Sequence, residues 1–220
     1  MRKFYLSFLA LALLGQCAFG AVVYQQSNSI GTVNVNGNAL SHLGDDVTLA
    51  GTERNLVSID VGTRYYFDAT HTAYTPILQL SLYDTTTPGT PGTGPGQLIA
   101  TSISTGLPFV GVAGSQDQTI TFLFNPVTDV VPNSFYLAVS QVNFDNNLAL
   151  HYDGNPTIGS TATAEFGKFQ ANPNFSAFNI GGVTGLQTTI NAVVPEPSTI
   201  ALLGMGALGM VMAARRRKTS

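Results

Sequence analysis

An alternation of apolar and polar residues with a period of two is the feature that most constrains this chain. Leu78, Leu80 and Leu82 alternate with more polar residues, and residues 119–124 and 136–142 alternate in the same way. Successive side chains of a β-strand point to opposite faces of a sheet, so each run has one apolar face. Between the two ends of the chain, no window shows the sustained 3.6-residue apolar stripe of an amphipathic helix. The pattern predicts an all-β fold.

Further strand candidates, rich in Thr, Val, Ile, Phe and Tyr, are separated by turn residues at the spacing typical of β-sandwiches and barrels. They are residues 21–26, 46–50, 55–61, 64–70, 97–103, 147–152, 161–166 and 187–193. We therefore expect residues 21–194 to form one antiparallel β-sandwich of the jelly-roll or Ig-like kind. A domain of this length buries a sizeable core without disulfides or a metal ion.

Residues 85–96 form a low-complexity segment that contains only Thr, Pro and Gly. This composition excludes a strand and predicts a flexible loop. A linker between two domains is the alternative. The loop is favoured because the preceding residues lack an independent core and the alternation continues on both sides.

Charged residues make up only 10% of the chain, against about a quarter in a typical soluble domain. Six of the nine Lys and Arg residues lie at the two ends. Residues 21–194 retain Arg54, Arg64 and Lys168 against eleven acidic residues, a formal net charge of −8. We expect no nucleic-acid partner, because binding phosphates requires clustered Lys and Arg.

The N-terminus has the three parts of a secretory signal peptide. Arg2 and Lys3 precede an apolar run from Phe4 to Leu14, and residues 18–20 form a small-x-small cleavage site. We predict a signal peptide over residues 1–20 that the export machinery reads, with cleavage between Gly20 and Ala21. A short buried helix is the alternative.

Cys17 lies inside the predicted signal peptide and raises the alternative of a lipoprotein. Gln16 is larger than the small residue expected before a lipidated cysteine, which argues against lipidation. Because Cys17 is the single cysteine of the chain, its removal leaves no thiol for a disulfide, a metal site or a nucleophile.

The C-terminus combines a short motif, an apolar segment and a basic tail. Pro195, Glu196 and Pro197 precede a predicted hydrophobic helix over residues 199–214, and residues 215–218 are three arginines and a lysine. The segment is shorter than the ~20 residues of a full membrane span, although snorkelling arginines extend it. The basic tail favours a cytoplasmic C-terminus. A buried core helix is the alternative.

Residues 195–220 resemble the PEP-CTERM sorting signal of Gram-negative bacteria. The resemblance implies recognition by an exosortase, an integral-membrane transpeptidase, with cleavage near the Pro195–Pro197 motif and loss of the tail. It also implies a precursor held transiently in the inner membrane, and then a protein of the cell surface or extracellular matrix, linked to exopolysaccharide, biofilm or floc. Pro195, Glu196 and Pro197 are then a processing motif rather than catalytic groups.

A second resemblance covers the exported segment. Residues 44–54, 95–99 and 130–135 are similar to strands of a domain that recurs in exported PEP-CTERM proteins, over about residues 40–155. This resemblance implies a β-sandwich and no particular function.

The sequence gives little sign of catalysis. His42, His71 and His151 lie in different segments without the spacing of a zinc site, and no GxSxG or SxxK motif occurs. A hydrolase with a dispersed active site stays open as the third alternative. Its candidate carboxylates are Glu53, Asp60, Asp68 and Glu165.

Two short oxygen-rich turns offer weak candidate ligands for Ca²⁺, which prefers oxygen donors. The candidates are Asp145 and Asn147 in the first turn and Asp153 and Asn155 in the second. Neither turn has EF-hand spacing, and Asp, Asn and Gly are also the ordinary residues of tight turns. We expect no cofactor, with Ca²⁺ as the open alternative.

These observations favour a non-enzymatic exported protein with a structural or adhesive role in a polysaccharide matrix. The main alternative is a carbohydrate-binding module that stacks sugars on tyrosine rings. The candidate tyrosines are Tyr65, Tyr66, Tyr83, Tyr136 and Tyr152. Cross-strand packing is the competing role for such residues.

Overall fold

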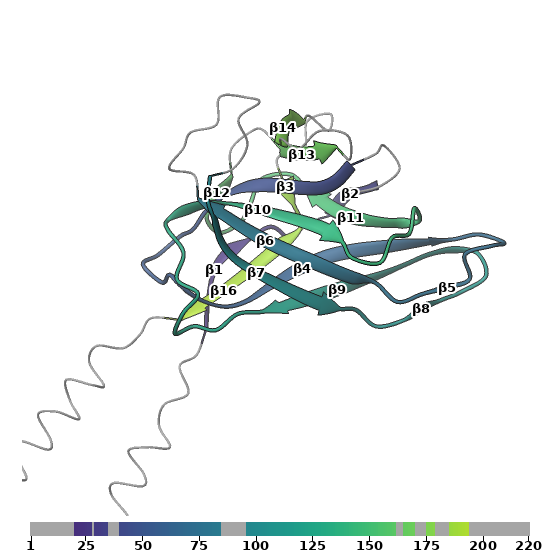
Figure 1. Cartoon of the computed structure of the whole chain (residues 1–220), viewed down its shortest axis with the longest axis horizontal. Helices are drawn as coiled ribbons and strands as arrows, with labels where there is room; N and C mark the ends of the chain where they lie inside the picture. Colours follow the sequence, from purple (N-terminus) through teal and green to yellow (C-terminus); the bar gives the residue numbers. More distant parts are fainter. Residues whose placement is uncertain are drawn as a thin grey trace, which may run out of the picture. The chain divides into compact units, whose positions relative to one another are not determined.

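The computed structural model describes residues 20–27, 29–34, 40–84, 96–161, 165–169, 175–178 and 185–193. All regular elements in these ranges are β-strands, and the strand pairs are antiparallel (Figure 1). The predicted all-β antiparallel sandwich is confirmed. The predicted signal peptide up to residue 19, the loop at 85–95 and the C-terminal segment 195–220 lie outside the described residues.

Most strands belong to two seven-stranded sheets, here called sheet A and sheet B. Sheet A has the order β1 (Ala21–Gln25), β16 (Thr188–Val193), β4 (Asn55–Phe67), β11 (Leu148–Asp153) and β15 (Gly185–Leu186), with β2 (Ser29–Asn34) paired to β11 and β9 (Gly114–Leu123) paired to β4. Sheet B has the order β14 (Phe175–Phe178), β13 (Glu165–Phe169), β3 (Leu40–Thr48), β10 (Ser134–Gln141), β6 (Ile77–Asp84) and β7 (Leu98–Thr105), with β12 (Ser160–Thr161) paired to β3. A separate ribbon pairs β5 (Ala73–Tyr74) with β8 (Phe109–Val110).

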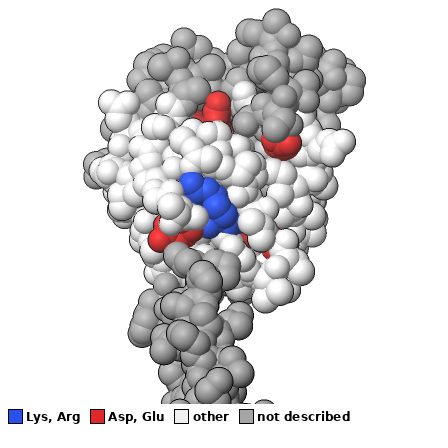
Figure 2. Space-filling model, turned by 90° about the vertical axis from the view of Figure 1, so that its left-hand side faces the viewer, with Lys and Arg blue, Asp and Glu red and all other residues white. Residues whose placement is uncertain are grey.

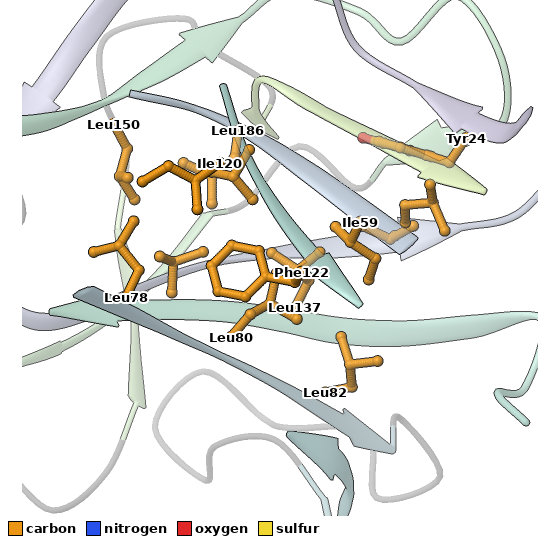
Figure 3. Packing of buried hydrophobic residues seen from close by; sticks show 14 of the residues in the cluster. Tyr24, Ile59, Leu78, Leu80, Leu82, Ile120, Phe122, Leu137, Leu150 and Leu186 are labelled. Atoms are coloured by element: carbon orange, nitrogen blue, oxygen red, sulfur yellow. The ribbon is translucent and has the colours of Figure 1, made fainter. Parts of the chain in front are cut away.

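The core lies between the two sheets (Figure 3). Leu78, Leu80 and Leu82, predicted to share an apolar face, are all fully buried. Phe122 of sheet A packs near Leu80 and Leu137 of sheet B. Each such side chain contributes about 1.5–3 kcal/mol by leaving water, so the alternating faces supply the stability of the sandwich.

β4 is one continuous strand, whereas the sequence predicted two strands, 55–61 and 64–70. That prediction is wrong because Gly62 continues the strand. The Gly62 amide donates to the Gln187 carbonyl (3.0 Å), and a Cβ at this position would lie 2.1 Å from Gln187 Oε1. The glycine therefore marks a close approach of two segments, not a turn.

Other strand predictions also need correction. The two ends of the predicted strand 161–166 fall in β12 and β13, which both pair with β3, and residues 162–164 lie outside the described residues. Sequence reasoning missed β2, β5, β8, β14 and β15. Most of these are short, and the pattern of so few residues is ambiguous.

The segment 85–96 connects neighbouring strands of sheet B. The Asp84 amide donates to the Gln97 carbonyl (2.9 Å), and the Gly96 amide donates to the Asp84 carbonyl (2.8 Å). β6 and β7 continue this pairing in antiparallel register. The strands on both sides of the segment thus belong to one sheet, and residues 19–193 form one compact unit.

Phe122 and its neighbour Leu123 provide a matched test of the core. Phe122 is fully buried, whereas Leu123 is 72% exposed on the opposite face of β9. We expect Phe122→Ala to lower the free energy of unfolding by about 3–5 kcal/mol through lost burial and a cavity. We expect Leu123→Ala to change it by less than about 0.5 kcal/mol. Urea denaturation of the purified protein measures both, and similar losses for the two variants would contradict this assignment of the core.

Candidate functional site

Three polar side chains from three strands of sheet A meet on its outer face. Arg64 of β4 lies opposite Asp117 of β9, and its Nε and Nη2 atoms donate to Asp117 Oδ1 (2.5 Å) and Oδ2 (2.8 Å). His151 Nε2 of β11 lies 3.1 Å from Asp117 Oδ1, and the His151 side chain is only 6% exposed. We call this group the Arg64–Asp117–His151 cluster.

Hydrogen bonding stabilises the charged forms of this cluster. The bond from Arg64 holds the pKa of Asp117 below its usual value, and the bond to Asp117 raises the pKa of Arg64. Because Arg64 and Asp117 are 32% and 52% exposed, water screens the pair and its contribution is about 0–1 kcal/mol. Chemically, the cluster offers a polar ligand a guanidinium, a carboxylate and an imidazole in fixed positions.

A second polar network lies just beyond the end of β4. Asp68 Oδ1 accepts hydrogen bonds from the Thr70 amide (2.7 Å), the Thr70 hydroxyl (2.7 Å) and the His71 amide (2.9 Å). Asn147 Nδ2 donates to Asp68 Oδ2 (3.0 Å). These donors, with Asn147 first, hold the pKa of Asp68 well below its usual value, and the Asp68 carboxylate raises the pKa of His71.

Asp145, one of the predicted calcium ligands, is hydrogen-bonded within the fold. Its Oδ1 accepts from the Asn147 amide (2.8 Å), and its Oδ2 accepts from the Tyr65 hydroxyl (2.9 Å). Asp153 ends β11 and Asn155 follows it. The two candidate turns therefore lie at opposite ends of one strand, roughly 20 Å apart, and cannot share one ion.

The three histidines are distributed over the fold. His42 lies on β3 of sheet B, His71 follows β4, and His151 lies on β11. Within the part of the chain that the structure describes, no three or more His, Cys, Asp or Glu residues gather to hold a metal ion. Calcium binding at the predicted turns stays a prediction.

The candidate carboxylates of the hydrolase alternative are also dispersed. Asp60 lies on β4, where its Oδ1 accepts from the Thr121 hydroxyl (2.6 Å), and Asp68 lies eight residues further along, roughly 26 Å away. That separation exceeds the span of a catalytic pair. Glu53 lies in the segment before β4, and the side chain of Glu165 on β13 is not among those described.

The five candidate tyrosines do not share one face. Tyr65 is buried, stacked between Tyr74 (ring centroids 5.1 Å apart) and Phe109 (5.3 Å). Tyr66 is 41% exposed, and its hydroxyl lies 2.6 Å from Thr32 Oγ1. The others are Tyr83 and Tyr136, which lie opposite each other in sheet B, and Tyr152, which packs against the core.

Sequence reasoning missed the Arg64–Asp117–His151 cluster and a buried polar group at β1. Tyr24 donates to Gln26 Oε1 (2.6 Å), and Gln26 Nε2 donates to the Gly154 carbonyl (2.7 Å). Except for Tyr24 and Gln26, the partners lie far apart in the sequence, and no local motif marks them. The one usable signal was the rarity of cations, because Arg64 is one of three in residues 21–194.

A family model described as the PEP-CTERM protein-sorting motif matches residues 193–218. The chain carries a PEP-CTERM sorting motif. The resemblance stated for residues 195–220 is confirmed, and the motif identifies a C-terminal signal of an exported protein that is targeted to an exosortase.

No curated protein matches the sequence. Among solved structures, a chain from the crystal structure of the T13 IBDV viral particle shares 13% identity over 90% of this chain and 46% of that chain, with a TM-score of 0.25. This chain thus matches less than half of the viral chain. A TM-score of this size establishes neither a shared fold nor a shared function.

The PEP-CTERM match begins on the last residue of the folded strands. Val193, the first matched residue, ends β16 and pairs with Asn55 of β4. Ala192 is fully buried and Val193 is 7% exposed. The sorting motif thus follows the sandwich directly. In the described ranges, no helix is long and apolar enough to cross a membrane.

The hydrogen bonds at Asp68 predict a pH-dependent contribution to stability. Because the folded-state pKa of Asp68 is depressed, its stabilisation is complete above the unfolded value of about 3.9 and is lost as the pH falls below it. We expect Asp68→Asn to be less stable than the wild type at pH 7, with the difference shrinking at about pH 2.5. Urea midpoints at the two pH values measure this, with Glu53→Gln as the control. A difference that is unchanged at low pH would contradict the prediction.

Proposed function

We propose that this chain is a non-catalytic, exosortase-processed protein whose β-sandwich serves a structural or adhesive role in exopolysaccharide, biofilm or floc. The observation that carries the proposal is the PEP-CTERM match at residues 193–218, placed directly after the last strand. In this scheme the export machinery removes the N-terminal segment, and the C-terminal helix holds the precursor in the inner membrane. An exosortase then acts at the Pro195–Pro197 motif.

The surface of the sandwich supports a role within a hydrated polymer. The face drawn in Figure 2 is mostly uncharged, with one small basic patch and a few acidic groups. The polar side chains described above bond largely to one another. Hydroxyl and amide groups suit contact with polysaccharide hydroxyls, whereas the net charge of −8 on residues 21–194 disfavours anionic partners.

The polar clusters also support a non-catalytic role. The carboxylates of Asp68, Asp117 and Asp145 each accept several hydrogen bonds from neighbouring side chains or amides. Groups occupied in this way fix turns and strand edges. We therefore assign them to the architecture rather than to chemistry.

Tail removal is the direct test of the sorting role. We expect mass spectrometry of the secreted protein from exosortase-positive cells to show the loss of residues 215–218, and replacement of Pro195, Glu196 and Pro197 by alanine to prevent that loss. Leu123→Ala, an exposed position outside the matched residues 193–218, is the control and should be processed normally. A secreted protein that retains its intact tail would overturn the proposed processing.

Carbohydrate binding is a second candidate function, favoured by the surroundings of Tyr66. This ring is 41% exposed on the outer face of sheet A. Tyr66 lies two residues after Arg64 on β4, and the Arg64–Asp117 pair presents planar hydrogen-bonding groups to solvent. Binding sites often combine an exposed aromatic ring, which contacts an apolar face of the ligand, with hydrogen-bonding groups, which contact its polar atoms.

Replacement of Tyr66 separates this candidate from a purely structural role. If the outer face of sheet A binds a glycan, Tyr66→Ala should weaken binding on a glycan array by roughly tenfold, as expected for loss of ~1.4 kcal/mol of contact. Tyr83→Ala, on sheet B, is the control and should bind like the wild type. Equal binding by both variants, or no saturable binding by the wild type, would exclude this site.

A further inference from the structure

The aromatic ring of Tyr66 lies flat across the outer face of sheet A. Its hydroxyl is 2.6 Å from Thr32 Oγ1 on β2, while its backbone amide donates to the carbonyl of Asn147, just before β11 (3.0 Å). To reach Thr32, the side chain crosses β11, which pairs with β4 on one side and with β2 on the other. The ring passes over Ala149, an outward-facing residue between two core leucines that is only 1% exposed. Tyr66 therefore turns one ring face to the sheet and the other to solvent.

Two hydrogen-bonded pairs continue from this ring along β4 and β9, on the same face of the sheet. Arg64 is held sideways against Asp117 by two hydrogen bonds. Further along β4, the Thr121 hydroxyl of β9 donates to Asp60 Oδ1 (2.6 Å). Thr121 is exposed, and its hydroxyl oxygen keeps lone pairs that accept hydrogen bonds from a ligand.

The surface between these two pairs is low. Gly62 has no side chain, and the side-chain amide of Gln187 occupies the place where its Cβ would lie. Opposite Gly62, Thr119 of β9 exposes a second hydroxyl. We call the surface that runs along β4 from Tyr66 to Asp60, together with the facing residues of β9, the β4 strip.

The dimensions of the β4 strip match a chain of sugars. From Tyr66 to Asp60 the strip covers six residue steps of β4, a span of roughly 20 Å, which is the length of about four pyranose rings in an extended chain. A pyranose ring has C–H groups on its faces and hydroxyls at its edge, so one ring stacks on Tyr66 while its neighbours bond to the polar pairs. Pyranoses joined by equatorial β-1,4 linkages form a straight ribbon, whereas α-linked chains coil away from a flat surface.

The charges of the β4 strip favour an uncharged chain. Asp60 and Asp117 are carboxylates, and the cation of the strip, Arg64, is already paired with Asp117. An anionic chain would meet the remaining negative charge of Asp60 and the net charge of −8 on residues 21–194.

We propose that the β4 strip binds an uncharged, β-1,4-linked glycan chain lengthwise, with one sugar stacked on Tyr66 and about three more along β4 and β9. This inference rests on the carbohydrate-binding candidate of the proposed function. It adds the charge, the linkage and the direction of the ligand to that candidate.

A chain-length series tests the lengthwise arrangement. The secreted protein is titrated with cello- and N-acetylchito-oligosaccharides of two and of six units, and with alginate hexamers as the anionic comparison, and binding is followed by NMR. We expect the hexasaccharide of at least one neutral series to bind about tenfold or more tightly than its disaccharide, because it reaches further polar groups of the strip. Equal affinities for the two lengths, tighter binding of alginate, or no saturable binding of either neutral series would overturn the inference.

Substitutions at the two ends of the β4 strip locate the chain. Thr121→Val removes the hydroxyl far from Tyr66 and keeps the β-branched shape that suits a strand. We expect it to weaken binding of the hexasaccharide about three- to tenfold and to leave the disaccharide unchanged, whereas Tyr66→Ala should weaken both. Thr101→Val, at an exposed threonine of β7 in sheet B, is the matched control. Unchanged hexasaccharide binding by Thr121→Val would overturn the lengthwise arrangement.

The outcomes also distinguish this inference from the function on which it rests. If a glycan array shows saturable binding of another class of glycan that depends on Tyr66, the carbohydrate-binding candidate stands and only the proposed ligand is wrong. If no glycan binds, both fail. Exosortase processing is decided separately, by the mass of the secreted protein.

Discussion

The structure depends on the complete pairing of β4. Over its 13 residues this strand pairs with β9 along one edge and with β16 and then β11 along the other. Ile59, Val61 and Tyr65 enter the core from it. Because a one-residue slip would turn these side chains to solvent, β4 fixes the register of its neighbours. Gly62 lies where the Gln187 segment approaches β4, so a side chain there would require the Gln187 side chain to move.

The position of β16 links the fold to the sorting signal. This last strand lies between β1 and β4, so sheet A is incomplete until residues 188–193 are in place. Ile190 and Ala192 are fully buried. During export, the chain must therefore be translocated almost to the sorting motif before the core closes. Val193, the first residue of the PEP-CTERM match, is itself paired with Asn55 in this sheet.

The sequence predicted the parts of the fold that depend on local pattern. Leu78, Leu80 and Leu82 identified a buried strand face because alternation alone determines which side chains point inward. The C-terminal sorting signal could also be predicted, because its short motif, apolar segment and basic tail are contiguous in the sequence. The predicted break in β4 was wrong. Gly62 lies where Gln187 approaches the strand, and Gln187 is 125 residues away in the sequence, so the local pattern does not show this contact.

The Arg64–Asp117–His151 cluster was unpredictable for the same reason. Its members are 34 and 53 residues apart and become neighbours only through the register of β9 and β11 on β4. The two calcium candidates show the converse case. Asp145 and Asp153 are close in the sequence, but the strand between them holds them at opposite ends. Residues that are close in the sequence also lie close in space when a turn separates them, but not when a strand separates them.

Side-chain hydrogen bonds join the two edge strands where β7 and β9 meet. Among the described residues, each of these strands pairs on only one side, an arrangement that invites another chain to add to the sheet. The Ser102 and Ser104 hydroxyls of β7 donate to the Leu123 (2.9 Å) and Thr121 (2.6 Å) carbonyls of β9.

The side chain of Gln118 continues this closure. Its Oε1 accepts from the Leu107 amide (3.0 Å), and its Nε2 donates to the Leu107 carbonyl (3.2 Å). Hydroxyl and amide groups thus occupy edge carbonyls that many proteins protect with lysine. Such groups carry no charge and remain compatible with a neutral polysaccharide. The scarcity of cations in residues 21–194 is therefore consistent with a fold in which the side where β7 and β9 meet is closed by hydrogen bonds rather than by charge.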